Sequence, residues 1–436
     1  MWWNIYLFTE NIYKLPIVAS FLALGVTQEL QIVHPWPTWI VSRNRRFPMG
    51  LSQPRKGMSG LSPRYMGLQS SCSMPEPRPV CIKVFSDPTP AADLISLGGK
   101  DLSLGNYSPT WRLQRKMAHT ALQRSLRGDL EPTVQDKAQC LCKVGPFLKV
   151  CVSLLWSFAP WQDLSVVEKM HDCMIDLVES WNAFSVQILD VLPFLKVRVA
   201  CKEGSFLLLW EACASLYSGQ YMKAGKPGDA ALTQEHVHMA IVDLLIGGTE
   251  TTAALLTWVV AFLLHHPRVG RGQIHQELMA VVGLSRDPTY SDREQLPYLS
   301  ATILETLRLR PSAPLALPHT ATRDTSLSGF SIPRGTTVIP NLYGAHHDQS
   351  KWQQPLEFRP GSRHLVPFSC GVRICLGEAV ARMESFLFLA HILRDFQILP
   401  STPGCLPDLQ EHFGFLVQCK PFTVRLVPRL VANPAE

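Results

Sequence analysis

The stretch FSCGVRICLG, residues 368 to 377, is the most informative part of this sequence. It places a glycine on each side of Cys375 and an arginine two residues before it. A cysteine that only packs in a core behaves as a small hydrophobic residue and needs no such neighbours. A thiolate that binds a metal must be kept deprotonated, and main-chain amides must approach its sulfur. Because Gly371 and Gly377 remove side-chain bulk and Arg373 adds a permanent positive charge, the pattern indicates a metal-binding thiolate.

The composition is typical of a large globular protein. The chain has 436 residues, of which 46% are hydrophobic and 17% are charged, which is enough apolar material for a large core. Lys and Arg exceed Asp and Glu by 41 to 35, a net charge of +6. This charge is too small to indicate a nucleic-acid partner, and it is compatible with an acidic protein partner or a membrane surface. The twelve cysteines are scattered, so they do not indicate a disulfide framework.

The N-terminal part of the chain leaves several alternatives open. Its best apolar run, residues 15 to 26, is shorter than the roughly 20 residues that a membrane-spanning helix needs. A truncated membrane anchor, an interfacial segment and a signal-like segment all fit this run. Residues 34 to 80 are rich in Pro, Ser, Arg and Gly without a sustained period, which predicts loop or disorder.

A capped helix is expected to begin after Ser108. The segment SPTWRLQRKMAHTALQR has Ser108 as the N-cap and Pro109 at the first helical position,. Trp111 and Arg115 are four residues apart and therefore share a face of this helix. One interpretation is an amphipathic helix whose indole packs in the core. The other is an indole N–H and a guanidinium that bind one anionic ligand, such as a carboxylate.

The longest apolar stretch, residues 235 to 267, predicts a buried core helix. Two histidines and two acidic residues interrupt it, which argues against a membrane span. Gly247 and Gly248 at its centre weaken a helix by about 1 kcal/mol each. They indicate either a close crossing of another helix or a distortion that opens a groove. In the second case Glu250 and Thr251 form an acid–alcohol pair that relays protons to a group bound there.

A second helix is expected from residue 301 until Pro311 ends it,. Glu305 and Arg308 are three residues apart on it and can form an ion pair. On a surface such a pair contributes little. Among the surrounding leucines and isoleucine it would be buried, where it must be fully hydrogen-bonded. The following segment, residues 327 to 348, alternates apolar and turn residues and predicts short strands with turns.

Together these segments resemble the cytochrome P-450 family. The haem-binding loop of that family has the pattern Phe-x-x-Gly-x-Arg-x-Cys-x-Gly, and Phe368, Gly371, Arg373, Cys375 and Gly377 fill every position. The Glu-x-x-Arg pair, the stretch GGTET and the Trp-x-x-x-Arg pair follow the family's order as well. The resemblance implies a mainly α fold, a helical triangular domain with a small β-rich lobe. It places this haem domain at residues 85–436, after a divergent N-terminal segment at residues 1–84.

The resemblance also implies a heme b group whose iron is bound by Cys375. Glu250 and Thr251 match the family's proton-relay residues. Glu305 and Arg308 match its structural ion pair. The positions that match the family's haem contacts are Trp111, Arg115, His319, Phe368, Gly371, Arg373, Cys375 and Gly377.

A finer resemblance, carried by HVHMAIVDLLIGGTETT, LRLRPSAPLALPH and IPNLYGAHHD, is to the steroid hydroxylases of this family. It implies a monooxygenase that hydroxylates a progesterone-type steroid at C21, with C17 or another lipophilic substrate as the alternative. Asp243, Gly247 and Leu315 would line the substrate pocket. Electrons would come from NADPH through a flavoprotein reductase, NADPH-cytochrome P-450 reductase. The protein would lie on the cytoplasmic face of the endoplasmic reticulum membrane and bind no nucleic acid.

The sequence also departs from the family pattern. After EFRP, residues 357 to 360, the family continues with Asp or Glu, Arg and Phe, whereas GSRHLVPF follows here. The arginine that joins the Glu-x-x-Arg pair is therefore missing, unless Arg363 replaces it. Residues 1–84 and 197–230 also match the family poorly. A non-catalytic product of the same gene family, unable to fold around haem, is therefore the second hypothesis.

Overall fold

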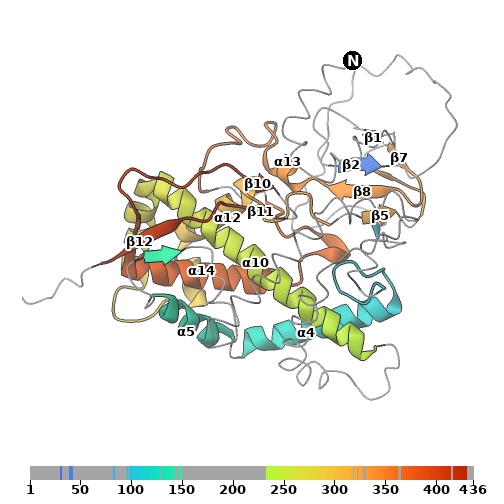
Figure 1. Ribbon diagram of the computed structural model, residues 1–436, viewed down its shortest axis with the longest axis horizontal. Helices are drawn as coiled ribbons and strands as arrows, with labels where there is room; N and C mark the ends of the chain where they lie inside the picture. Colours follow the sequence, from blue (N-terminus) through green and yellow to red (C-terminus); the bar gives the residue numbers. More distant parts are fainter. Residues whose placement is uncertain are drawn as a thin grey trace, which may run out of the picture.

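The computed structural model describes residues 96–142 and 232–429 apart from short gaps, together with short strands at residues 30–31, 39–42, 82–83 and 147–149 (Figure 1). The predictions for residues 15–26, most of residues 34 to 80, residues 197–230 and Arg363 fall outside the described residues. Within residues 34 to 80, residues 39–42 form a strand and not the predicted loop.

Helix α4, Pro109–Arg127, confirms the predicted capped helix. The Ser108 hydroxyl accepts a hydrogen bond from the Trp111 amide at 3.0 Å, which satisfies one of the amides that every helix start leaves unpaired. The next helix, α5, spans Leu130–Cys142. Trp111 is buried at 4% exposure, so the apolar side of α4 faces the core.

Helix α10, Gln234–His265, runs through the middle of the molecule, as the diagonal ribbon in Figure 1 shows. It is α-helical without interruption through Gly247 and Gly248, so the expected distortion is absent from its backbone. Among the described residues it is the one helix long and apolar enough to cross a membrane. Its C-terminal half from Thr252 to Leu264 is buried, as the prediction of a core helix requires.

The main hydrophobic core lies where α10 meets two further helices. These are α12, Pro297–Leu309, and α14, Glu378–Asp395. Helix α12 ends two residues before Pro311, as predicted. Fully or nearly fully buried members of this core include Leu256, Leu299 and Phe388. The interlocked core fixes the relative positions of α10, α12 and α14, which together carry much of the candidate site.

The strands form small antiparallel sheets at the periphery. The five-stranded sheet has the order β1-β2-β8-β5-β3, and a three-stranded sheet has the order β4-β12-β9. Two hairpins, β6–β7 and β10–β11, complete the set. The bounds are β1 Leu30–Gln31, β2 Trp39–Ser42, β3 Ile82–Lys83, β4 Phe147–Lys149, β5 His319–Ala321, β6 Thr325–Leu327, β7 Phe330–Ile332, β8 Thr337–Pro340, β9 Phe396–Pro400, β10 His412–Phe413, β11 Val417–Gln418 and β12 Thr423–Pro428.

The strands β2, β5 and β8 lie together at one end of the molecule, apart from α14 and α5 (Figure 1). The expectation of a mainly helical fold with a small β-rich lobe is thus confirmed. Within residues 327 to 348 the predicted strands are present, but one part of the prediction is wrong. Residues Leu342–His346 form the short helix α13, because the Asn341 side chain caps it by accepting the Gly344 amide at 2.8 Å,.

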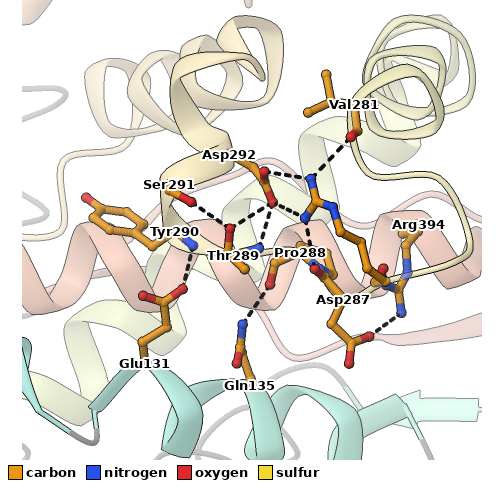
Figure 2. A network of polar contacts seen from close by, with 11 residues as sticks. Glu131, Gln135, Val281, Asp287, Pro288, Thr289, Tyr290, Ser291, Asp292 and Arg394 are labelled. Carbon is orange, nitrogen blue, oxygen red and sulfur yellow. Dashed lines mark hydrogen bonds and ion pairs between the residues drawn. The ribbon is translucent and has the colours of Figure 1, made fainter.

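The connection between α11, His275–Val281, and α12 is held by a polar network (Figure 2). Arg286 donates two hydrogen bonds to Asp292, each of 2.8 Å. Asp292 also accepts the Thr289 amide at 2.8 Å. Such a bidentate pair fixes geometry as well as adding energy, so the connection adopts one defined shape.

The same connection is attached to α5 and α14, as Figure 2 shows. Glu131 accepts the Tyr290 amide at 2.7 Å, and Gln135 donates to the Pro288 carbonyl at 2.9 Å. Arg394 of α14 donates to Asp287 at 3.0 Å. These contacts anchor the turn Tyr290–Glu294, which forms one wall of the cavity described below.

Candidate functional site

The loop that carries Cys375 has a backbone that requires glycine at one position. Gly371 has φ of 76° and opens a short 3₁₀ turn, Gly371–Arg373. Side chains with a Cβ rarely adopt this left-handed conformation. The Cys375 amide donates to the Phe368 carbonyl at 2.9 Å, which closes the loop. Helix α14 begins three residues later, at Glu378.

The Cys375 thiol lies at the start of α14. Desolvation of the sulfur raises its pKa although Cys375 as a residue is exposed, and the negative charge of Glu378 raises it further. The amides of Gly377 and Glu378 bond to the sulfur and act in the opposite direction, as does the Arg115 charge. The net shift is upward. The chain alone therefore favours the protonated thiol, and a metal cation at the sulfur would have to displace that proton.

Cys375 forms part of the wall of a cavity of about 1030 Å³. The cavity lies between α4, the Tyr290–Glu294 turn, α12, the cysteine loop and α14. Its charged lining residues are Arg115, Lys116, Arg293, Glu294, Glu378 and Arg382, and its larger apolar ones are Leu126, Ile303, Leu304, Leu307, Phe368 and Phe386. Among the described residues, none from α10 lines this cavity, so Glu250 and Thr251 do not face it.

Two arginines flank the Trp111 ring, one from the cysteine loop and one from α4. The Arg373 guanidinium lies 3.6 Å from the ring centroid and that of Arg115 lies 5.4 Å from it. The Trp111 indole N–H donates to the Leu102 carbonyl at 3.0 Å. Trp111 and Arg115 share a face of α4, as predicted, and the ring itself is in the core. Because the indole N–H is bonded to the Leu102 carbonyl, the interpretation in which this N–H binds an anionic ligand is wrong, and the Arg115 guanidinium is the part of the pair that remains a candidate for such a ligand.

The two guanidiniums are bound to main-chain carbonyls. Arg373 donates to Leu102 O at 3.2 Å and to Gly105 O at 2.7 Å, and Arg115 donates to Ile374 O. Neither Arg373 nor Arg115 belongs to an ion pair within the described part of the chain, where the arginines that form ion pairs are other ones. Burial, followed by the positive charge of Arg115, lowers the pKa of Arg373 to about 9. The Arg373 Nε atom is buried and has no hydrogen-bond partner among the described residues. This cationic cluster therefore offers a good partner to a carboxylate.

The centre of α10 faces open space. A Cβ built at Gly247 or Gly248 would meet nothing within 4 Å among the described residues, so no helix of the described part of the chain crosses closely at these glycines. Thr251 donates its hydroxyl to the Gly247 carbonyl at 2.6 Å, and Glu250 is buried at 5% exposure. One turn earlier, Leu245 belongs to the same apolar cluster as Leu376 of the cysteine loop.

The three residues predicted to line a substrate pocket lie in different settings. Asp243 accepts the Leu102 amide at 2.5 Å and therefore binds the segment before α4. Gly247 faces open space, and Leu315 is half-buried in a turn after α12. His319 is buried in β5 and does not line the cavity beside Cys375. None of these four residues lines the cavity beside Cys375.

The Glu305–Arg308 pair is buried, as the leucine-rich surroundings predicted. The two side chains are 1% and 2% exposed and are bonded bidentately at 2.8 and 2.9 Å. The main-chain N–H of Arg359 donates to Glu305 Oε1 at 2.8 Å. A main-chain donor thus supplements the pair, while Arg363, which could replace the family's third arginine, lies outside the described residues.

Sequence reasoning missed the loop of residues 101 to 105, which meets Trp111, Arg373 and Asp243. It has neither a period nor a motif, because its partners lie far away along the chain. Its only local signal is the sequence DLSLG, in which Asp and Ser indicate a turn with side-chain to main-chain hydrogen bonds,.

Comparisons with known proteins agree with this arrangement. The cytochrome P-450 family model matches residues 213–426. Steroid 21-hydroxylase of Bos taurus is 40% identical over 391 residues, covering 78% of this chain and 78% of that protein. Steroid 21-hydroxylase of Felis catus is 41% identical over 397 residues, covering 79% and 80%. A zebra fish cytochrome P-450 structure with progesterone has a TM-score of 0.66 and 31% identity, covering 78% of this chain and 87% of that one.

Proposed function

This chain belongs to the cytochrome P-450 family of monooxygenases, and we propose that it hydroxylates a progesterone-type steroid at C21. The observation that carries the proposal is the 41% identity to a steroid 21-hydroxylase over 79% of the chain. This similarity supports the broader statement that the chain is a steroid-hydroxylating enzyme. The position of hydroxylation is the finer part of the proposal.

The residues around Cys375 fit a haem group. Cys375 lines a cavity, and two amides bond to its sulfur; hydrogen bonds of this kind are how proteins tune a thiolate ligand. The Nε of Arg373, which is buried and has no partner among the described residues, and the adjacent Arg115 suit the carboxylates that a haem carries,. We therefore infer that Cys375 binds the iron and that Arg373 and Arg115 hold the carboxylates. Trp111 would support both guanidiniums through its ring.

Bound haem would supply the chemistry of oxygen activation and C–H hydroxylation, which the side chains lack. The chain's own part is to bind, orient and move protons. For proton transfer we propose the Thr251 hydroxyl and the Glu250 carboxyl, a role that requires haem to reach the α10 side of Cys375, outside the cavity described above. Because Thr251 donates to the Gly247 carbonyl, its hydroxyl must rotate away from that carbonyl to donate a proton elsewhere.

The remaining haem contacts carried over from the family stay proposals. Phe368 lines the cavity beside Cys375, which is compatible with shielding the sulfur from water. Gly371, with its positive φ, shapes the loop before the thiol, and Gly377 leaves the space after it open. His319 lies in β5, and a role in haem binding would require haem to extend toward the five-stranded sheet.

An apolar, rigid steroid would be bound mainly by burial of its rings, with few hydrogen bonds to set its orientation. Asp243, Gly247 and Leu315 are the proposed pocket residues. Electrons would come from NADPH through a flavoprotein reductase, and the protein would act at the endoplasmic reticulum membrane. The mildly basic net charge of +6 suits an acidic redox partner and an anionic membrane surface.

The first experiment tests thiolate ligation. Purified protein, reduced under carbon monoxide, is expected to show the red-shifted Soret band of a thiolate-bound haem. Cys375→Ser should abolish this band. Cys370→Ala is the matched control and should keep it, since Cys370 lies outside the Arg-x-Cys-x-Gly frame. Absence of the band in wild-type protein would favour a non-catalytic product of the gene family. Loss of the band in Cys370→Ala but not in Cys375→Ser would show that Cys370 is the ligand.

The second experiment tests the substrate. Progesterone added to the haem-loaded protein should shift the haem spin state, because the steroid displaces water from the site. With a reductase and NADPH, mass spectrometry should then find hydroxylation at C21. Hydroxylation at C17 instead would support a steroid hydroxylase and refute C21 as the carbon that it hydroxylates. A spin shift with unrelated lipophiles but not with steroids would refute the steroid assignment while keeping the monooxygenase.

A further inference from the structure

The loop of residues 101 to 105 is held against α10 by one carboxylate. Asp243 Oδ2 accepts the amides of Leu102 at 2.5 Å and Ser103 at 3.1 Å. Its Oδ1 atom lies 2.9 Å from the Ser103 hydroxyl. A carboxylate that accepts main-chain amides forms strong, charge-assisted hydrogen bonds. Asp243 is therefore the polar attachment of this loop to the helix, beside the apolar packing of Leu102 against α10.

A second carboxylate holds the loop from within. Asp101 is buried at 2% exposure, and its Oδ2 accepts the Leu104 amide at 3.0 Å. The Ser103 hydroxyl lies 2.9 Å from Asp101 and 2.9 Å from Asp243. A hydroxyl has one proton to donate, so Ser103 can satisfy both acids fully only if one of them is protonated. Burial and the neighbouring Asp101 charge raise the pKa of Asp243 to about 7, in keeping with a shared proton.

The other side of the same loop holds Arg373. The Leu102 and Gly105 carbonyls occupy two of its donors, and the Leu102 carbonyl also accepts the Trp111 indole N–H. The loop is tight at this point, since a Cβ on Gly105 would lie 2.4 Å from the Asp101 carbonyl oxygen. With two donors fixed, the guanidinium is held over the Trp111 ring, and its buried Nε has no partner in the part of the chain that the structure describes.

We propose that Asp243, through the loop of residues 101 to 105, is a positioning residue that aims Arg373 at the anionic groups of a haem bound beside Cys375. The inference rests on the proposed function and assigns Asp243 a role different from lining the substrate pocket. Asp243 does not touch Arg373. It fixes the amides of Leu102 and Ser103, and these fix the Leu102 carbonyl that orients the guanidinium.

The experiment compares Asp243→Ala and Asp243→Asn with a matched control on the same helix. Glu235→Gln removes an exposed ion pair between α10 and Lys100, next to the same loop. Ser103→Ala is a second variant, which removes only the bridging hydroxyl in case the Asp243 variants fail to fold. Two quantities are measured on full-length protein: hydrogen exchange of the amides in residues 101 to 105, and the rate at which haem transfers to apomyoglobin.

In Asp243→Ala we expect these amides to exchange at least about tenfold faster, since two charge-assisted hydrogen bonds are lost. Haem should leave at least about tenfold faster as well, because Arg373 is no longer held in place. Asp243→Asn and Ser103→Ala should lie between Asp243→Ala and wild type. Glu235→Gln should match wild type within about twofold.

Unchanged exchange in the Asp243 variants would overturn the proposal, and so would faster exchange with an unchanged rate of haem transfer. The second result would leave Asp243 with a structural role only. Equal effects in Glu235→Gln would also overturn it, because the loop would then respond to any change on this side of α10. If wild-type protein takes up no haem, the proposed function fails and this inference fails with it. If wild type binds haem and the variants match it, only this inference fails.

Discussion

Replacing Arg308 with lysine should destabilise the fold by about 4 kcal/mol, because all five guanidinium donors are used. Nε and Nη2 bond to the Glu305 carboxylate at 2.9 and 2.8 Å. Nη1 donates to the carbonyls of His346 and Pro355 at 3.0 and 2.6 Å, and Nη2 also donates to that of Glu357 at 2.9 Å. Lysine has three donors, so at least two buried acceptors lose their partner. Each orphaned acceptor costs about 1–3 kcal/mol, which gives about 2–6 kcal/mol in total.

The measurement is urea unfolding followed by tryptophan fluorescence, with Trp352 as a local reporter since its ring lies 4.8 Å from the Arg308 guanidinium. With a slope of about 3 kcal/mol per molar urea, the midpoint should fall by about 1 M. Arg293→Lys is the control, because Arg293 is 46% exposed and lies 3.9 Å from Glu294. Its effect should be below about 1 kcal/mol. If Arg308→Lys lowers the unfolding free energy no more than Arg293→Lys does, the hydrogen bonds of Arg308 do not stabilise the fold by the amount given above.

Three further outcomes follow from the site. Gly371→Ala should lower the unfolding free energy by about 1 kcal/mol, because Gly371 has a φ of 76°,. Gly377 has a φ of −91° and open space around it, so Gly377→Ala should be neutral in the same urea assay. Equal effects of the two substitutions would show that the positive φ of Gly371 is not what makes it sensitive. Thr251→Ala should consume NADPH without a matching yield of hydroxylated product, while Thr249→Ala should keep the two coupled; unchanged coupling in Thr251→Ala would remove this hydroxyl from proton transfer. The pKa of Asp243 is raised to about 7 in the folded state. The folded protein therefore binds this proton more tightly than the unfolded chain does. As a result, the unfolding free energy falls as pH rises from about 4 to 7. Asp243→Asn should remove this part of the slope in urea unfolding between pH 5 and 8, and an identical slope in wild type and variant would exclude a raised Asp243 pKa as its cause.

The local features of the fold could be predicted from the sequence because their causes are close together in the chain. Ser108 and Pro109 mark the start of α4 through bonds and angles within one turn,. Pro311 ends α12 for an equally local reason,. The spacing of Glu305 and Arg308 among leucines predicted a buried pair. The Asn341 cap of α13 was overlooked, since the surrounding alternation favoured a strand.

By itself the sequence also determined the cysteine loop, because Gly371 and the Arg-x-Cys-x-Gly frame lie within ten residues of each other. Only the tertiary structure decided which groups surround it. Asp243 and Leu102 are 141 residues apart, and Arg373 and Leu102 are 271 apart. Local periodicity and turn chemistry carry no information about such pairs. They meet because the packing of α4, α10 and the cysteine loop around one apolar cluster brings their main chains together, and burial then forces each polar group to find whichever partner that packing supplies.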